Sequence, residues 1–119
     1  MSYQHIKFAI EDGIANLVHA RDDVRNAISD ITFVGEIVDA VSRAQISTET
    51  HVLVLSAEGS AFFAGDNVNH MRDKTRTFAD GPATVRRNYI EGTQRVPKVL
   101  YAFDISSVAA VPGPAIGAG

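Results

Sequence analysis

With 119 residues, of which 45% are hydrophobic and 21% charged, the chain has the size and composition of one small globular domain. Its net charge of −3, its scattered basic residues and the lack of any apolar run near the ~20 residues of a membrane span predict no nucleic-acid or membrane partner. The lack of cysteine excludes disulfides, thiolate metal sites and a cysteine nucleophile, and the lack of a signal-peptide pattern predicts a cytoplasmic protein.

The first predicted elements are two strands joined by a tight turn. Residues 3–10 and 14–20 contain alternating apolar side chains, a period that is typical of strands. Glu11-Asp12-Gly13 lies between them, and an Asp-Gly pair in this position favours a hairpin. Residues 21–26 are too polar for a third strand and are predicted to form a loop.

A helix and a buried strand are predicted next. Ser29 is the expected N-cap of the helix. Its buried face is predicted from five apolar residues at helical spacing, which are Val34, Ile37, Val38, Val41 and Ala44. Residues 51–56 form a short apolar run, which is typical of a strand covered on both faces in an α/β sheet. A glycine-containing turn follows at residues 58–67.

The second half repeats the order of helix and strand. Residues 71–80 are predicted to be a polar surface segment, and residues 82–103 a helix that Pro97 kinks or divides. Its apolar stripe consists of Val96, Val99, Leu100 and Phe103. Residues 106–111 are predicted to be another buried strand, which continues into the glycine-rich residues 112–119. This order predicts an α/β fold in one domain, and a glycine-rich loop with no helix after it indicates a fragment.

Two turns of small residues are the candidate sites for chemistry. Ala64-Gly65-Asp66 and Gly117-Ala118-Gly119 each follow a predicted strand. Their main-chain N–H groups could converge on one oxygen as an oxyanion hole, or the turns could simply satisfy packing. Asp66 and the adjacent Asn67 could likewise face a ligand or cap a short helix.

Other motifs are absent or structural. The order of glycines at Gly113, Gly117 and Gly119 does not match the dinucleotide fingerprint, and the phosphate-loop signature is missing. The four histidines have no metal-ligand spacing and are interpreted as structural or surface residues: His5, His19, His51 and His70. Arg86-Arg87, with Arg95 and Lys98, is interpreted as a solvated helix face.

Four segments, in order along the whole chain, resemble the crotonase (enoyl-CoA hydratase/isomerase) family. Residues 25–29 (Arg-Asn-Ala-Ile-Ser) are similar to its basic-Asn-Ala-Leu-Ser stretch, and residues 59–68 to its Phe-x-Ala-Gly-small-Asp/Asn-aliphatic turn. Residues 94–101 resemble part of a long helix in one subgroup, and residues 109–119 its Ala-Ala-Val-Asn-Gly-x-Ala-x-Gly-Gly/Ala-Gly loop. The resemblance implies the N-terminal part of a crotonase-like ββα spiral, with residues 1–119 as the N-terminal portion of one acyl-CoA-binding domain.

The resemblance also implies a ligand and the residues that hold it. The family binds acyl-CoA thioesters, with coenzyme A as part of the substrate and no tightly bound cofactor or metal. The backbone N–H groups of Asp66 and Ala118 match its oxyanion hole. The positions that match its CoA-binding residues are Arg25, Asn26, Ala27, Ala64, Asp66, Asn67, Val68, Gly117 and Ala118. The full-length form is expected to be a homo-oligomer, a trimer or a hexamer.

Three departures from the family pattern leave the reaction open. Asp66 stands where the family has Ala or Gly, and Pro112 where it has Asn. The two glutamates of family hydratases follow the glycine loop, and neither Glu58 nor Glu91 matches their positions. The expected function is that of an enoyl-CoA hydratase or isomerase fragment. The alternatives are another crotonase chemistry, such as thioester hydrolysis, decarboxylation or dehalogenation, and a non-catalytic truncated chain.

Overall fold

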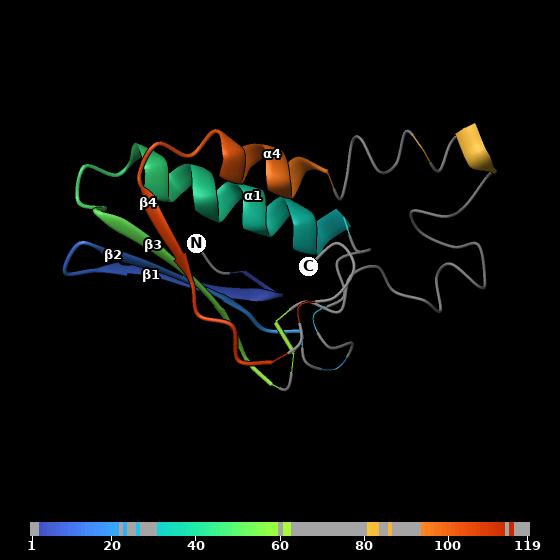
Figure 1. The fold of residues 1–119 in the computed structure, drawn as a ribbon, viewed down its shortest axis with the longest axis horizontal. Helices are drawn as coiled ribbons and strands as arrows, with labels where there is room; N and C mark the ends of the chain where they lie inside the picture. Colours follow the sequence, from blue (N-terminus) through green and yellow to red (C-terminus); the bar gives the residue numbers. More distant parts are fainter. Residues whose placement is uncertain are drawn as a thin grey trace.

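The fold is a sheet with helices packed on one of its faces (Figure 1). A computed structural model describes residues 3–21, 23, 26, 31–59, 61–62, 81–83, 86, 94–113 and 115. The elements are β1 (Ile6–Glu11), β2 (Ile14–His19), α1 (Ile31–Ile46), β3 (Val52–Ala57), α4 (Arg95–Tyr101) and β4 (Ser106–Ala109). The order of elements predicted from the sequence, and with it the α/β class, is confirmed.

The predicted hairpin joins β1 to β2. Glu11 pairs with Ile14, which leaves Asp12 and Gly13 as a two-residue turn. Both have positive φ angles, 51° and 82°, the conformation that matches the twist of hairpin strands and that an Asp-Gly pair adopts readily. β1 begins at Ile6, three residues later than predicted, because the N–H groups of Gln4 and His5 are directed to the Glu36 carboxylate.

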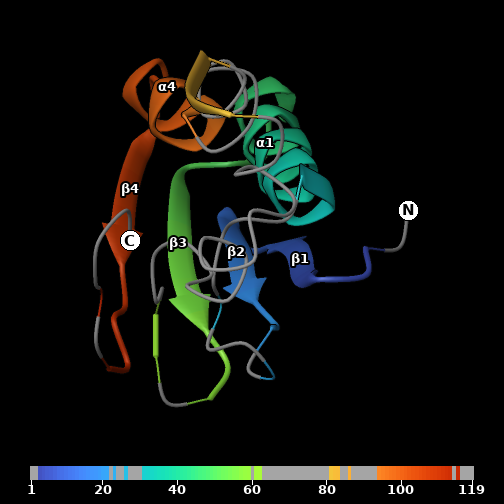
Figure 2. The same ribbon diagram turned by 90° about the vertical axis from the view of Figure 1, so that its right-hand side faces the viewer.

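Strand direction brings three strand ends to one edge of the sheet. The strand order is β1-β2-β3-β4, in which β1 and β2 are antiparallel while β2, β3 and β4 are parallel. Parallel neighbours need a crossover, and α1 provides it between β2 and β3. Figure 2 shows the arrowheads of β2, β3 and β4 pointing the same way. The segments that follow these strands therefore start from the same edge.

The core lies between α1 and the sheet, with α4 packed against α1. Four of the five helix residues predicted to be buried are buried, and Val38 is half-buried. The sequence pattern missed Phe33 and Ala40, which are also fully buried. The other buried apolar residues are Ile6, Ala15, Leu17, Leu53, Ala61, Phe62 and Val96. Full burial of a Leu or Ile side chain contributes about 1.5–3 kcal/mol, so these residues dominate the folding energy.

Two predictions of strand burial are wrong. All four residues of β4 are exposed, and Val108 and the following Val111 keep 54% and 50% of their surface accessible. In β3 only Leu53 is fully buried. Among the described elements β4 is one of the two edge strands, and the helices cover one face of the sheet. A prediction from apolar composition alone therefore overestimated the burial of these strands.

The predicted helix at residues 82–103 is described only in part. Residues 82, 83 and 86 are helical, and α4 begins at Arg95. Pro97 lies in the first turn of α4, where the missing N–H leaves no helical hydrogen bond unmade. Within the apolar stripe Val96 is buried, while Val99, Leu100 and Phe103 pack partly against the core. The predicted cap Ser29 and surface segment 71–80 lie outside the described residues. No described helix has the length and apolarity needed to cross a membrane.

Candidate functional site

The candidate site is the edge at which β2, β3 and β4 end. Main-chain hydrogen bonds continue past the strands here: Glu58 N–H donates to His19 O at 2.8 Å, and Ala110 N–H donates to Leu55 O at 2.8 Å. The segments beyond are therefore anchored to the sheet where they leave it. Ligand sites of parallel α/β sheets form beyond the carboxyl ends of the strands, which makes this the edge where the predicted binding turns begin.

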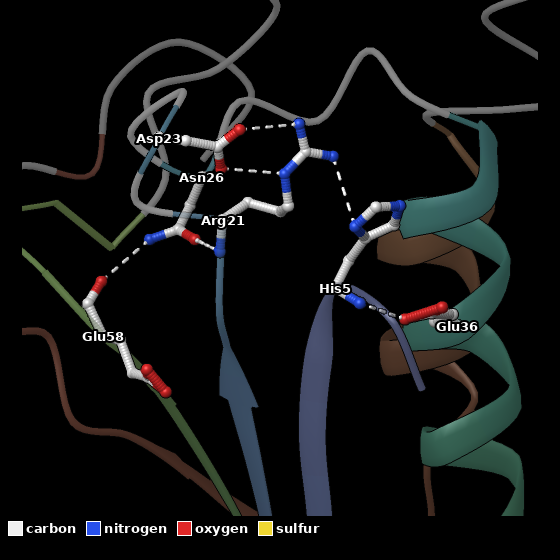
Figure 3. Close-up of polar contacts among 6 residues, drawn as sticks. All are labelled: His5, Arg21, Asp23, Asn26, Glu36 and Glu58. Carbon is white, nitrogen blue, oxygen red and sulfur yellow. Dashed lines mark hydrogen bonds and ion pairs between the residues drawn. The ribbon is translucent and has the colours of Figure 1, made fainter. Parts of the chain in front are cut away.

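Asn26 joins the loop after β2 to the turn after β3. It is fully buried and has a φ of 57°, a left-handed conformation that asparagine tolerates. Its side-chain Oδ1 accepts a hydrogen bond from Arg21 N at 2.7 Å. Its Nδ2 donates to Ala61 O at 2.9 Å and to Glu58 O at 3.2 Å. Figure 3 shows the amide between Arg21 and Glu58. One side chain thus satisfies main-chain groups from two segments that are 32 or more residues apart.

Arg21 organises the start of the same loop. Its Nε and one terminal nitrogen donate to the two carboxylate oxygens of Asp23, at 2.9 and 3.1 Å. These hydrogen bonds are the main reason that the pKa of Asp23 lies below its usual value. The other terminal nitrogen lies 3.2 Å from His5 Nδ1 (Figure 3). Because a guanidinium only donates, this contact requires His5 Nδ1 to accept, and it links the loop to the segment before β1.

The segment before β1 is in turn fixed to α1. The Glu36 carboxylate accepts hydrogen bonds from Gln4 N, at 2.9 and 3.0 Å, and from His5 N at 2.7 Å. Tyr3 Oη donates to Asp39 at 2.6 Å. Burial, followed by this hydrogen bond, raises the pKa of Tyr3 to about 12. The same hydrogen bond is the largest cause that lowers the pKa of Asp39.

His19 lies beneath the candidate site, at the last position of β2. It is 1% exposed, and its ring makes edge-to-face contacts with Phe33, at a centroid distance of 5.8 Å, and with Phe62 at 5.1 Å. Burial disfavours the charged ring and lowers its pKa from 6.5 to about 4. His19 is therefore neutral near pH 7, and it connects α1 to the turn after β3.

Of the residues that the sequence assigned to binding, the structure describes Asn26. Both polar atoms of its side-chain amide are hydrogen-bonded to main-chain groups. Its role as a residue that lines the ligand stays a prediction. The other assigned residues lie outside the described residues, and the predictions for them stand untested: Arg25, Ala27, Ala64, Asp66, Asn67, Val68, Gly117 and Ala118. Phe62, the last described residue of the turn, stands two positions before Ala64.

Sequence reasoning missed the role of Arg21 at this edge, and it interpreted His19 as a structural or surface residue without placing it in the core. The alternation of β2 contained a usable signal for His19, because Ala15, Leu17 and His19 share one face of the strand and the first two are small or apolar. No comparable signal existed for Arg21, whose partners come from the loop itself and from the segment before β1. Among the described residues, no group of three or more histidine, aspartate or glutamate side chains is arranged to hold a metal ion.

Comparison with known proteins identifies relatives but no matching family model. The chain is 29% identical over 119 residues to the “probable enoyl-CoA hydratase” of Rhodobacter capsulatus. That alignment covers 100% of this chain and 42% of the relative, so the chain spans less than half the length of the curated protein it matches.

Solved structures show the same relationship. An enoyl-CoA hydratase/isomerase from Xanthobacter autotrophicus superposes with a TM-score of 0.84 at 22% identity, over 98% of this chain and 42% of that one. An enoyl-CoA hydratase subunit I from Geobacillus kaustophilus gives a TM-score of 0.71 at 27% identity, over 92% of this chain and 38% of that one. The Xanthobacter structure, at 22% identity, shows the fold alone. The Geobacillus structure, at 27% identity, shares the fold and more of the sequence. The resemblance inferred from the sequence is therefore confirmed: the chain is a relative of the crotonase (enoyl-CoA hydratase/isomerase) family and corresponds to part of the length of its members.

Proposed function

We propose that the chain binds acyl-CoA thioesters at the edge where β2, β3 and β4 end, and that the N–H groups of Asp66 and Ala118 receive the thioester oxygen. The observation that carries the proposal is the linkage of two predicted ligand segments by Asn26, which holds the loop after β2 to the turn after β3. The relationship to proteins named enoyl-CoA hydratases supports the choice of ligand.

The chemistry that such a site serves is the stabilisation of an enolate. In the hydration of an enoyl thioester, the oxygen of water bonds to the β-carbon, the electron pair of the double bond moves toward the carbonyl, and negative charge collects on the thioester oxygen. A proton then reaches the α-carbon and the carbonyl reforms. Two fixed N–H donors stabilise the intermediate charge, and the loss of one such donor typically costs about 2.7–4 kcal/mol of barrier.

We assign thioester binding and carbonyl polarisation to this chain, and we assign no acid–base residue. No carboxylate of the sequence matches the positions of the family's catalytic glutamates. Glu58, the acidic residue in the described part of the turn after β3, forms an ion pair with Lys7 of β1, two strands away in the sheet. Other crotonase reactions would use the same oxyanion site, since they differ in the acid–base groups and not in the polarised carbonyl.

The test is a titration of the chain with crotonyl-CoA labelled with ¹³C at the thioester carbonyl. Calorimetry gives the affinity, and infrared spectroscopy gives the carbonyl stretch, which two N–H donors shift to lower frequency. Asp66→Pro removes an N–H and is expected to abolish the infrared shift, whereas Asp66→Ala keeps the N–H and preserves it. Equal shifts for both variants, or no binding by the wild type, would contradict the proposal.

No resident cofactor is part of the proposal, and coenzyme A enters only as part of the substrate. A homo-oligomer, trimeric or hexameric, also stays a prediction for the full-length form. Sedimentation of the chain at several concentrations tests whether residues 1–119 are enough for such assembly.

A further inference from the structure

We propose that Asn26 is a positioning residue: its amide fixes the loop after β2 and the turn after β3 relative to each other, and it does not itself touch the ligand. This inference rests on the proposed function, because it concerns the geometry of the proposed acyl-CoA site. It differs from the ligand-lining role that the sequence motif implied for this residue.

Burial and hydrogen-bond capacity exclude a direct ligand contact by Asn26 in this conformation. The residue has no exposed surface. An asparagine amide has two N–H donors, and both are used, on Ala61 O and Glu58 O. The Oδ1 acceptor is used by Arg21 N at 2.7 Å. Because the side chain is fully buried, a ligand could reach the second lone pair of Oδ1, or replace one of these bonds, only if the surrounding segments moved.

Asn26 joins the two segments that are predicted to bind the ligand, so its hydrogen bonds bear on the geometry of the proposed site. Its chain neighbours are Arg25 and Ala27, which the sequence assigns to the CoA-binding loop. Its partners Glu58 and Ala61 lie in the turn that leads to Asp66. The amide therefore couples the segment expected to hold the CoA arm to the segment expected to supply an oxyanion N–H. A hole built from N–H groups works only when its donors are held in place, so the coupling bears on carbonyl polarisation.

Two substitutions at residue 26 distinguish the effect of losing the side-chain amide from the effect of changing the backbone conformation. Asn26→Gly removes all three side-chain bonds but keeps the φ of 57°, which glycine adopts without strain. Asn26→Asp keeps an acceptor for Arg21 N and loses both donors to Ala61 O and Glu58 O. Asn16→Asp, at an exposed position of β2, makes the same change of charge as a control.

The expected result is a larger effect on the carbonyl than on coenzyme A. For Asn26→Gly and Asn26→Asp, the affinity for crotonyl-CoA should fall about tenfold or more and the infrared shift of the bound carbonyl should shrink. The affinity for free coenzyme A should change less, and Asn16→Asp should behave as the wild type. Wild-type affinity and shift in Asn26→Gly would overturn the proposal. An equal loss for CoA and crotonyl-CoA with an unchanged shift would also overturn it, in favour of a direct CoA contact.

Hydrogen exchange separates this inference from a failure of the proposed function. The Arg21 amide is protected by Asn26 Oδ1, so Asn26→Gly should expose Arg21 and the turn after β3 to exchange while β1 and β2 stay protected. If the wild type binds no crotonyl-CoA, the proposed function fails, and exposure confined to these residues still supports the coupling of the two segments. Unchanged exchange in Asn26→Gly would refute the coupling whatever the ligand.

Discussion

Burial of His19 makes the stability of the chain depend on pH in a defined window. The ring is 1% exposed between Phe33 and Phe62, and its pKa in the folded state is about 4 against 6.5 for an exposed histidine. The unfolded chain therefore binds a proton at this residue before the folded chain does. By linkage, the contribution of His19 to stability is complete above pH 6.5, falls as the pH is lowered from 6.5 to about 4, and is lost below that.

The size of this effect follows from the difference between the two pKa values. Each unit corresponds to about 1.4 kcal/mol, so complete acidification should cost about 3 kcal/mol of unfolding free energy through this residue. That is a large part of the stability of about 5–15 kcal/mol that is typical of such domains. The lowered pKa values of Asp23 and Asp39 place their own loss of stability below their ordinary value of 3.8, outside the window assigned to His19.

Urea unfolding followed by circular dichroism between about pH 7 and pH 4 measures the effect. His19→Leu removes the titrating group while keeping an apolar side chain, and its unfolding free energy should vary less with pH than that of the wild type. His51→Gln, which removes a histidine at an exposed position, is the matched control for the loss of a histidine. The reasoning is refuted if His19→Leu retains the full wild-type slope, or if nuclear magnetic resonance shows His19 titrating near 6.5 in the folded chain.

Three further substitutions test contacts around the sheet. Gly13→Ala should destabilise the chain by about 1–2 kcal/mol, measured by urea unfolding, because φ is 82° and the new Cβ would lie 2.5 Å from His51 Cδ2; an unchanged midpoint would contradict this. Tyr3→Phe should cost about 1 kcal/mol and flatten the loss of stability between pH 10 and about 12, since the folded phenol holds its proton longer than the unfolded one; a tyrosine absorbance titration with no late-titrating group would argue against it. Glu36→Gln should accelerate amide exchange at Gln4 and His5 with little change elsewhere, and equal exchange rates in both forms would show that the carboxylate is dispensable.

The sequence predicted elements whose causes are local. The Asp12-Gly13 turn was predictable because both residues tolerate positive φ, and the buried face of α1 because its apolar residues recur at the helical period. Burial of β4 was not predictable in this way. An apolar strand has the same sequence whether or not another layer covers it, and at Val108 no described element does so.

The candidate site was predicted as a set of motifs but not as a set of contacts. The motif that contains Asn26 was read from local sequence, yet two hydrogen bonds of its amide go to main-chain groups more than 30 residues away, which no local pattern encodes. His19 differs, because the period of two in β2 places it on the core face with Leu17. Local periodicity therefore predicts orientation, while long-range polar contacts require the structure.

Polar satisfaction explains how the described loops at the candidate edge are held to each other. Beyond the last paired residues of β2 and β3, main-chain groups lose their strand partners, and buried groups left unpaired would cost about 1–3 kcal/mol each. The Asn26 amide supplies partners for three main-chain groups, of which Ala61 O is buried and Arg21 N and Glu58 O are part-buried. Since these partners belong to two different segments, neither can move away from the other without leaving a buried group unpaired. Displacement of the turn after β3 would therefore break the hydrogen bonds that tie it to the loop after β2.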